Sequence, residues 1–175
     1  MTHPKSFGSD NHAGMHPAVL RAIADANAGD AVAYGDTALI ERFISGTEGA
    51  VGVIDLGDGP QALPAVEIVP GEGEYDYAAR YTAGKTEFYV PARLSAAVAD
   101  EVARIAIAAH TVLGLRDLSR TDLIVDDDGT AWFLEVNVSP GMTETSTLPL
   151  ALEASGHPFG RTCVRLLEQA AARGT

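Results

Sequence analysis

The chain of 175 residues carries 24 Asp and Glu against 12 Lys and Arg, a formal net charge of -12, and 46% of its residues are hydrophobic. The acidic balance argues against nucleic acid as a partner, because phosphate binding relies on a basic surface. The apolar residues suffice for a core, but no apolar run approaches the length of a membrane span. A single Cys163 excludes an intramolecular disulfide, so we expect a cytoplasmic protein.

The first part of the chain predicts one helix and then a group of strands. Pro17 can open the helix, and Leu20 and Ile23 follow at helical spacing. Residues 38–91 change to short apolar runs typical of strands, "GAVGVIDL" and "ALPAVEIVP". The turn "GDGP" between these runs predicts an antiparallel pair.

A long loop and two helices are predicted in the rest of the chain. The polar and aromatic stretch "GEGEYDYAARYTAGKTEFYVPA" has no periodicity, and long loops of this kind often act as lids. Ser95 can cap a helix that ends at Gly114. Its predicted apolar face consists of Val98, Val102, Ile105, Ala109 and Val112. A last helix over residues 158–172 is expected to pack on the core through Cys163, Val164, Leu166 and Leu167.

The stretch "TDLIVDDDGTAWFLEVNVSPGMTETS", residues 121–146, predicts a β-hairpin followed by a loop. Asp128 and Gly129 suit a two-residue type I′ turn, because such a turn needs residues that tolerate positive φ. In that register one face is nearly apolar, with the cross-strand pairs Val125–Trp132, Leu123–Leu134 and Thr121–Val136. The other face carries the pairs Ile124–Phe133, Asp122–Glu135 and Arg120–Asn137.

The polar pairs at the open end of this hairpin predict a cation site. Asp122 and Glu135 are carboxylates placed opposite each other, which repel and destabilise a sheet. Mg²⁺ reverses that repulsion, since it takes oxygen ligands from one or two carboxylates and completes its shell with substrate phosphates. Asn137 adds a neutral oxygen, and Arg120 can hold a phosphate or a developing negative charge. The alternative is a solvated edge in which Arg120 is the counter-charge to both acids.

The loop "SPGMTETS" after the hairpin is rich in Ser, Thr and Gly. Its backbone N–H groups and hydroxyls could bind a carboxylate or an oxyanion. The alternative is an ordinary connecting loop.

These residues closely resemble the C-terminal part of D-alanine–D-alanine ligases, members of the ATP-grasp superfamily. The resemblance covers residues 38–175 and includes "ERFISGTEGAVGVI", "LPAVEIVP", "YDYAARYTAGKTEFYVPA" and "LPLALEASGHPFGRTCVRLLEQA". It implies an α/β fold of the α+β type, in which helices back an antiparallel sheet. It also implies the joining of two D-alanines with ATP and Mg²⁺ (or Mn²⁺) through an acyl phosphate, in peptidoglycan synthesis.

The resemblance implies a role for each polar residue of the hairpin and its loop. Two Mg²⁺ ions would be held between the β- and γ-phosphates by Asp122, Glu135 and Asn137. Arg120 and the backbone N–H of Gly141 would stabilise the tetrahedral intermediate. Ser146 would bind the carboxylate of the second D-alanine.

The resemblance also implies a nucleotide site. Adenine and ribose would lie among Glu41, Phe43, Ile44 and Glu48. Tyr81 would lie in a loop that closes over the site, and Lys85 matches the pattern of that loop. Arg80 stands where the family usually has a lysine that reaches phosphate, so the charge is kept but a planar fork replaces a compact ammonium group.

Residues 7–36, "FGSDNHAGMHPAVLRAIADANAGDAVAYGD", instead resemble the opening of low-specificity threonine aldolases, which use PLP. We therefore expect an extension over residues 1–37 and a ligase domain over residues 38–175. The Schiff-base lysine of the aldolases has no counterpart, so a PLP-dependent aldolase is the least favoured function.

The resemblance does not include the N-terminal ligase domain or the other ATP-grasp half. We therefore expect the isolated chain to be inactive. The alternative to a ligase is a non-catalytic fragment that binds a nucleotide or associates through an exposed apolar surface, as a homodimer or with the missing ligase domains.

Overall fold

The computed structural model describes residues 42–70 and 86–173. Its elements in chain order are β1 (Thr47–Asp55), β2 (Pro60–Ala62), β3 (Val66–Pro70), β4 (Thr86–Tyr89), α3 (Ala96–Val112), β5 (Leu118–Val125), β6 (Ala131–Asn137), α4 (Thr147–Ala154) and α5 (Phe159–Ala172). None of the helices in these ranges is long and apolar enough to cross a membrane.

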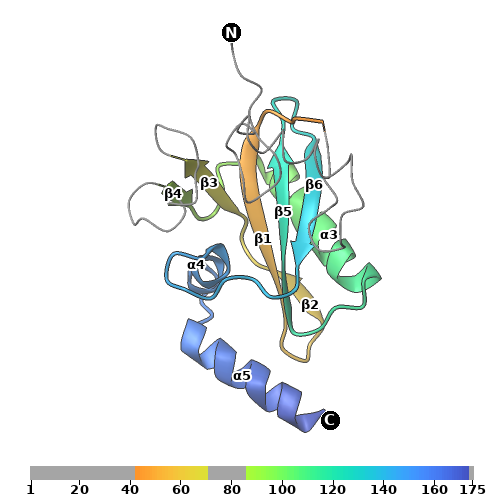
Figure 1. The fold of residues 1–175 in the computed structure, drawn as a ribbon, viewed down its shortest axis with the longest axis vertical. Helices are drawn as coiled ribbons and strands as arrows, with labels where there is room; N and C mark the ends of the chain where they lie inside the picture. Colours follow the sequence, from red (N-terminus) through yellow and green to blue (C-terminus); the bar gives the residue numbers. More distant parts are fainter. Residues whose placement is uncertain (1–41, 71–85, 174–175) are drawn as a thin grey trace, which may run out of the picture.

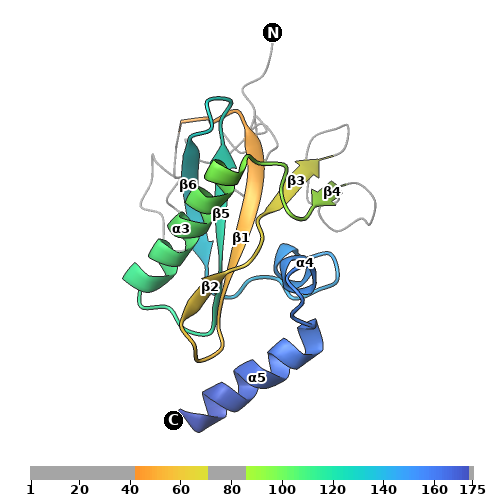
Figure 2. The ribbon, with the colours of Figure 1, turned by 180° about the vertical axis from the view of Figure 1, so that it is seen from behind.

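The strands form one antiparallel sheet in the order β4-β3-β1-β5-β6, and β2 pairs with β1. Helix α3 covers one face of the sheet (Figure 2). Helix α4 covers part of the other face, and α5 extends from it below the sheet (Figure 1). The predicted α+β fold with an antiparallel sheet backed by helices is confirmed.

Each face of the sheet has its own hydrophobic core. Residues at odd positions of β1 and β5 point toward α3, and those at even positions point toward α4, because side chains alternate along a strand. The core under α3 contains Val51, Val53, Val102, Ala106, Leu123 and Val125. The core under α4 contains Ile54, Leu63, Val66, Leu148, Ala151 and Leu152.

Two predicted apolar helix faces are only partly correct. The side chain of Ser95 caps α3 as predicted, but Val112 is exposed and the buried stripe is Val102, Ala106 and His110. In α5, Val164 and Leu167 were expected to pack on the core, but both are exposed. Among the described residues, α5 packs inward through Phe159 and Thr162 instead.

The hairpin has the predicted register at its open end and a different one near its turn. Asp122 pairs with Glu135, whereas Leu123 pairs with Phe133 and Ile124 pairs with Trp132. A bulge at Leu134, where the register shifts, separates the two parts of the ladder. The predicted pairs Val125–Trp132, Leu123–Leu134 and Ile124–Phe133 are therefore wrong.

The turn itself explains this shift. The N–H of Asp126 donates to the carbonyl of Thr130 (3.0 Å), and the N–H of Gly129 donates to the carbonyl of Asp126 (2.9 Å), so the loop has three residues and not two. The Asp126 carboxylate accepts from the N–H groups of Asp128 and Thr130 and from Nε1 of Trp132. These bonds lower the pKa of Asp126, that from Trp132 most, and they stabilise the longer loop.

A buried histidine joins α3 to β5. His110 is 2% exposed, and its Nδ1 lies 2.8 Å from Oγ of Ser119. Its Nε2 has no hydrogen-bond partner among the described residues. Burial lowers the pKa of the ring, and Asp55 and Asp117 raise it by a smaller amount.

We expect this histidine to destabilise the fold in acid. The pKa in the folded chain is below the unfolded value of about 6.5, so the unfolded chain binds the proton first as the pH falls. The neutral His110 ring makes its full contribution to stability above the unfolded pKa. That contribution is lost as the pH falls from the unfolded pKa through the folded one. Between about pH 7 and pH 5.5, the urea midpoint should fall more for the wild type than for His110→Gln. Equal falls would exclude this role for His110.

Candidate functional site

The two acids that the sequence pattern placed opposite each other do face each other in the structure. Asp122 on β5 pairs with Glu135 on β6, and Arg120 pairs with Asn137 two residues along. Because positions two apart on a strand share a face, all four side chains lie on one face of the sheet. Leu118, on the same face, packs in the core under α4, so the four polar residues lie just above that core.

Arg120 and Asp122 form a buried pair. Nε of Arg120 donates to Oδ1 of Asp122 and Nη2 donates to Oδ2, both at 2.6 Å. The two side chains are only 10% and 8% exposed. Two parallel hydrogen bonds of this kind offset the charge of the Asp122 carboxylate and fix its plane.

Two small residues of β1 lie beside this pair on the neighbouring strand. Ala50 pairs with Asp122, and Gly52 pairs with Arg120. A Cβ atom at Gly52 would lie 2.5 Å from Cδ1 of Leu148 and 2.9 Å from Cδ1 of Leu63, so glycine here lets the core leucines pack beside Arg120. Glu48 lies two residues before Ala50 and therefore on the same face, so the structure brings this predicted ribose ligand toward the metal-site residues.

The loop after β6 crosses this face of the sheet on its way to α4 (Figure 1). Oδ1 of Asn137 accepts from the N–H of Ser139 at 2.8 Å, which holds the start of the loop. The Ser146 hydroxyl lies 2.9 Å from that of Thr143. A Cβ atom at Gly141 would lie 2.7 Å from Oγ of Ser146, so the structure brings Gly141 and Ser146 together, and a side chain at 141 would displace the hydroxyl.

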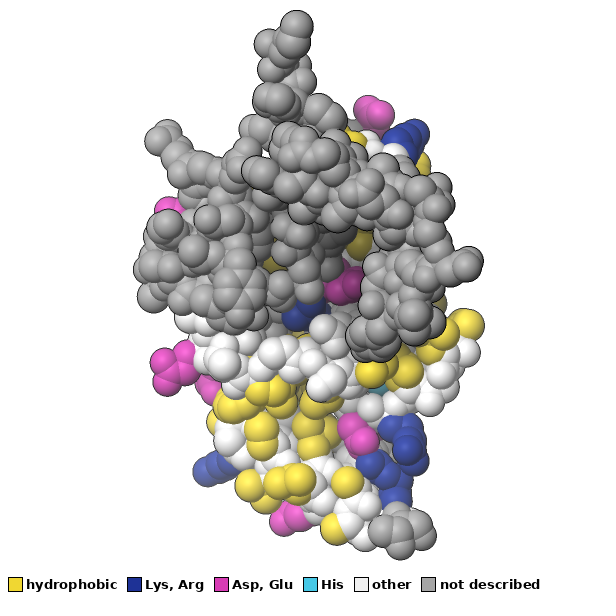
Figure 3. Space-filling model, in the orientation of Figure 1, with side chains coloured by type: hydrophobic (Ala, Val, Ile, Leu, Met, Phe, Trp, Pro, Cys, Tyr) yellow, Lys and Arg dark blue, Asp and Glu magenta, His cyan; other side chains and the backbone are white. Residues whose placement is uncertain are grey.

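The oxygen set of this face suits a hard cation. Asp122 and Glu135 supply carboxylates and Asn137 supplies an amide oxygen, which are the ligand types that Mg²⁺ takes. In the described ranges no group of three or more His, Cys, Asp or Glu residues could hold a metal ion, so a site on this face depends on the Asn137 amide as its third protein oxygen. Positive and negative side chains lie close together near the middle of this face (Figure 3).

The other predicted nucleotide residues lie before β1 or outside the described ranges. Phe43 is exposed and Ile44 is half-buried. The guanidinium carbon of Arg42 lies 4.4 Å from the ring centre of Trp132 on β6, a contact that no local pattern predicted. It places the segment before β1 beside the site. Four predicted site residues lie outside the described ranges: Glu41, Arg80, Tyr81 and Lys85.

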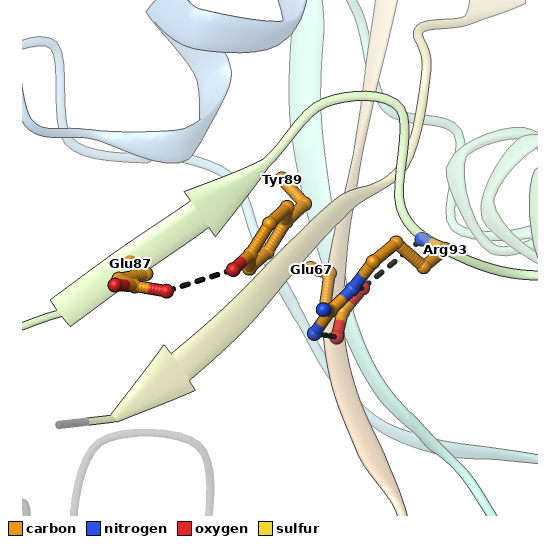
Figure 4. Close-up of polar contacts among 4 residues, drawn as sticks. All are labelled: Glu67, Glu87, Tyr89 and Arg93. Atoms are coloured by element: carbon orange, nitrogen blue, oxygen red, sulfur yellow. Dashed lines mark hydrogen bonds and ion pairs between the residues drawn. The ribbon is translucent and has the colours of Figure 1, made fainter. Parts of the chain in front are cut away.

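A second polar cluster supports β3 and β4 (Figure 4). The buried Glu67 carboxylate accepts from the N–H, Nε and Nη2 of Arg93 at 3.0, 2.9 and 2.6 Å. The Arg93 guanidinium lies 3.8 Å over the ring of Tyr89, and the Tyr89 hydroxyl donates to Glu87. The bonds from Arg93 lower the pKa of Glu67. Glu67 is at an odd position of β3 and points away from Asp122, so this cluster is structural.

Comparisons with known proteins agree with this geometry. The family described as "D-ala D-ala ligase C-terminus" matches residues 11–168. A D-alanine–D-alanine ligase of Anaeromyxobacter dehalogenans is 40% identical over 169 residues, which are 97% of this chain and 54% of that protein. One of Bordetella petrii is 41% identical over 143 residues, 82% of this chain and 44% of that protein. The chain thus spans about half the length of the curated relatives that it matches.

Solved structures show the same likeness. The D-alanine–D-alanine ligase of Bacillus anthracis has a TM-score of 0.60 at 29% identity and covers 73% of this chain and 40% of its own. The VanG D-Ala:D-Ser ligase of Enterococcus faecalis has a TM-score of 0.61 at 29% identity, over 73% of this chain and 37% of its own. The family match begins at residue 11, within the segment that resembles threonine aldolases. That resemblance and the boundary near residue 37 fall outside the described ranges and stay predictions.

Proposed function

The chain belongs to the D-alanine–D-alanine ligase family, and from this premise we propose that its partly covered sheet face is one wall of a site for ATP- and Mg²⁺-dependent ligation of D-alanine, in the cytoplasmic synthesis of peptidoglycan precursors. The observation that carries this proposal is the buried Arg120–Asp122 pair, which faces Glu135 across two strands. Arg120 offsets the charge of Asp122, and Glu135 adds a second carboxylate, so these three side chains together carry one negative charge that a divalent cation would balance.

The metal ligands in this proposal are Asp122, Glu135 and Asn137. Bound Mg²⁺ (or Mn²⁺) would offset the charge of the ATP phosphates in a chain that is itself strongly acidic. Arg120 does two things here: it holds the Asp122 carboxylate in one plane, and it brings a guanidinium to the place where negative charge develops.

The loop between β6 and α4 would receive the second substrate. The N–H of Gly141 would face the oxyanion, and the Ser146 hydroxyl would bind the substrate carboxylate. Ser146 directly precedes α4, and the N-terminus of a helix favours negative charge. The close approach of Gly141 to Ser146 supports this arrangement, since a side chain at position 141 would displace the hydroxyl that binds the substrate.

The nucleotide would lie beside the metal ligands. Adenine and ribose would contact Phe43, Ile44 and Glu48, together with Glu41, while Arg80, Tyr81 and Lys85 would act on the phosphate side. ATP in this fold is held between two subdomains, so we propose that turnover needs a second ATP-grasp half opposite this face. The 175 residues alone should bind Mg·ATP without ligating D-alanine.

Calorimetric titration with Mg·ATP tests this site. Glu135→Gln removes an exposed carboxylate and should reduce the affinity about tenfold or more, a difference of about 1.4 kcal/mol. Asp122→Asn should have the same effect. The control is Asp127→Asn, which removes the same charge from the exposed hairpin turn and should leave the heats unchanged. Equal heats from the wild type and the two site variants would refute the proposal.

The second candidate function is association, either with a second copy of the chain or with other ligase domains. It is favoured by Val164 and Leu167, two large apolar side chains of α5 that are exposed to solvent.

A further inference from the structure

Trp132 lies on the same face of the sheet as the predicted metal ligands. Cross-strand partners share a face, and Trp132 on β6 pairs with Ile124 on β5, which in turn pairs with Glu48 on β1. The neighbouring row on this face contains Asp122 and Glu135. The indole ring therefore lies one row from the metal ligands and in the same row as the predicted ribose ligand.

The bulge in β6 brings the ring to this face. Trp132 and Glu135 are three residues apart, and in a regular strand two such residues point to opposite faces. The register shift at Leu134 reverses the alternation, so both side chains lie on one face. The hairpin without a bulge, as the sequence predicted it, would have placed Trp132 on the apolar face with Val125.

The ring of Trp132 is held at its edge and covered on one side. Its Nε1 donates to Oδ2 of Asp126 at 2.8 Å, and the guanidinium carbon of Arg42 lies 4.4 Å from the ring centre. The Asp126 carboxylate is itself fixed by the N–H groups of Asp128 and Thr130. The hairpin turn thus fixes the ring, and the ring gives the Arg42 side chain a defined position.

Residues 42–46 cross the top of the sheet from β6 to β1 (Figure 1). Two contacts with the hairpin define this path. At one end, Arg42 lies over Trp132. At the other end, a Cβ atom at Gly46 would lie 2.1 Å from the carbonyl oxygen of Val125. The two predicted adenine residues of this segment lie between the contacts, so the contacts set their position above the sheet.

We propose that Trp132 is a positioning residue for the nucleobase: its ring holds Arg42, and Arg42 in turn holds Phe43 and Ile44 where they contact adenine. This inference rests on the proposed nucleotide site. Arg42 is exposed, and a cation–π contact at an exposed position changes an equilibrium constant by about two- to fivefold. The segment would hold the base, whereas the metal ligands act on the phosphates. The effect of losing the contact should therefore depend on the base.

Calorimetric titration with Mg·ATP and with Mg·GTP tests this dependence, because the two nucleotides share ribose and triphosphate and differ in the base. Trp132→Leu and Arg42→Ala should each weaken Mg·ATP about two- to fivefold and leave Mg·GTP unchanged. Trp132→Phe keeps an aromatic face and should recover most of the Mg·ATP affinity. Glu135→Gln, on the phosphate side, should weaken both nucleotides.

A double variant shows whether the two residues act through one contact. Arg42→Ala combined with Trp132→Leu should bind Mg·ATP no more weakly than the weaker single variant, because both substitutions remove the same interaction. The matched control is Phe133→Leu, which changes an exposed aromatic side chain on the opposite face of the same strand and should leave both affinities unchanged. Urea unfolding checks that every variant is folded.

The contact can also be measured without a nucleotide, because Trp132 is the only tryptophan of the chain. Arg42 covers one side of the ring, so Arg42→Ala should increase the quenching of the Trp132 fluorescence by acrylamide. Equal quenching in the wild type and this variant would overturn the inference. Arg42 is exposed, so this variant should fold whether or not Trp132→Leu does.

The titrations distinguish the failure of this inference from the failure of the nucleotide site. A wild type that gives no heat with Mg·ATP would refute the site and this role with it. A wild type that binds both nucleotides equally well, variants that weaken both alike or neither, or single effects that multiply in the double variant would overturn the role of Trp132 alone. In these last cases the site proposed at Asp122 and Glu135 is judged by its own variants.

Discussion

Arg120→Met is expected to destabilise the chain by about 3 kcal/mol, because it removes one partner of a buried ion pair and leaves the other charge buried. Asp122 is 5% exposed, and its carboxylate accepts two hydrogen bonds from the Arg120 guanidinium. Without the guanidinium, the Asp122 carboxylate would lie opposite the carboxylate of Glu135 and no longer be paired with Arg120. Urea unfolding with an unchanged m value measures the loss.

A second substitution separates stability from function. Arg120→Met combined with Asp122→Leu replaces the pair with apolar side chains of similar size, which often matches or exceeds the stability of a buried ion pair. We expect the double variant to recover most of the loss but to give no Mg·ATP heat. The control is Arg104→Met, which breaks an exposed pair with Glu101 and should not change stability measurably. A double variant as unstable as the single variant would contradict this account.

Gly46→Ala should destabilise the fold by about 2 to 3 kcal/mol through overpacking. A Cβ atom at this position would lie 2.1 Å from the carbonyl oxygen of Val125 and 2.9 Å from Cα of Asp126. Both are backbone atoms where β5 enters the hairpin turn, so no side-chain rotation relieves the clash. The turn or the start of β1 would have to move.

Gly49→Ala, three residues further along in β1, is the matched control for this substitution. Its Cβ would lie 3.5 Å from Cδ1 of Leu123 and 3.6 Å from the carbonyl oxygen of Val66, which are ordinary contacts. We expect its urea midpoint to stay close to that of the wild type, while that of Gly46→Ala falls. Equal falls in the urea midpoint of the two variants would show that the loss of glycine itself, and not the close approach to β5, destabilises the fold.

The sequence predicted the elements whose signals are local. The helix capped by Ser95 and the antiparallel strands follow from spacing and turn residues, and so does the pairing of Asp122 with Glu135. The turn was mispredicted because the Asp126 side chain bonds the backbone across the loop, which a dipeptide signal does not contain. The bulge at Leu134 then compensates for the longer turn and restores the predicted register at the acids.

Contacts between distant residues could not be predicted in this way. Glu67 and Arg93 are 26 residues apart in the chain, and their bond depends on how β3 meets the segment before α3. Val164 and Leu167 of α5 were predicted to lie in the core but are exposed. Periodicity shows that one side of a helix is apolar, but it does not show which neighbour covers that side. The Arg120–Asp122 bond could have been predicted from the sequence, since opposite charges two residues apart on a strand lie on the same face.

Whether a divalent cation binds between β5 and β6 can be measured with Mn²⁺ in place of Mg²⁺, by the paramagnetic broadening of backbone amide signals in the presence of ATP. Binding at Asp122, Glu135 and Asn137 predicts that substoichiometric Mn²⁺ first broadens the signals of residues 120–123 and 134–138. The exposed acids of the turn, residues 126–128, should keep sharp signals at that ratio. Broadening that centres on the turn, or that spreads evenly over the acidic surface, would contradict a metal site on this face.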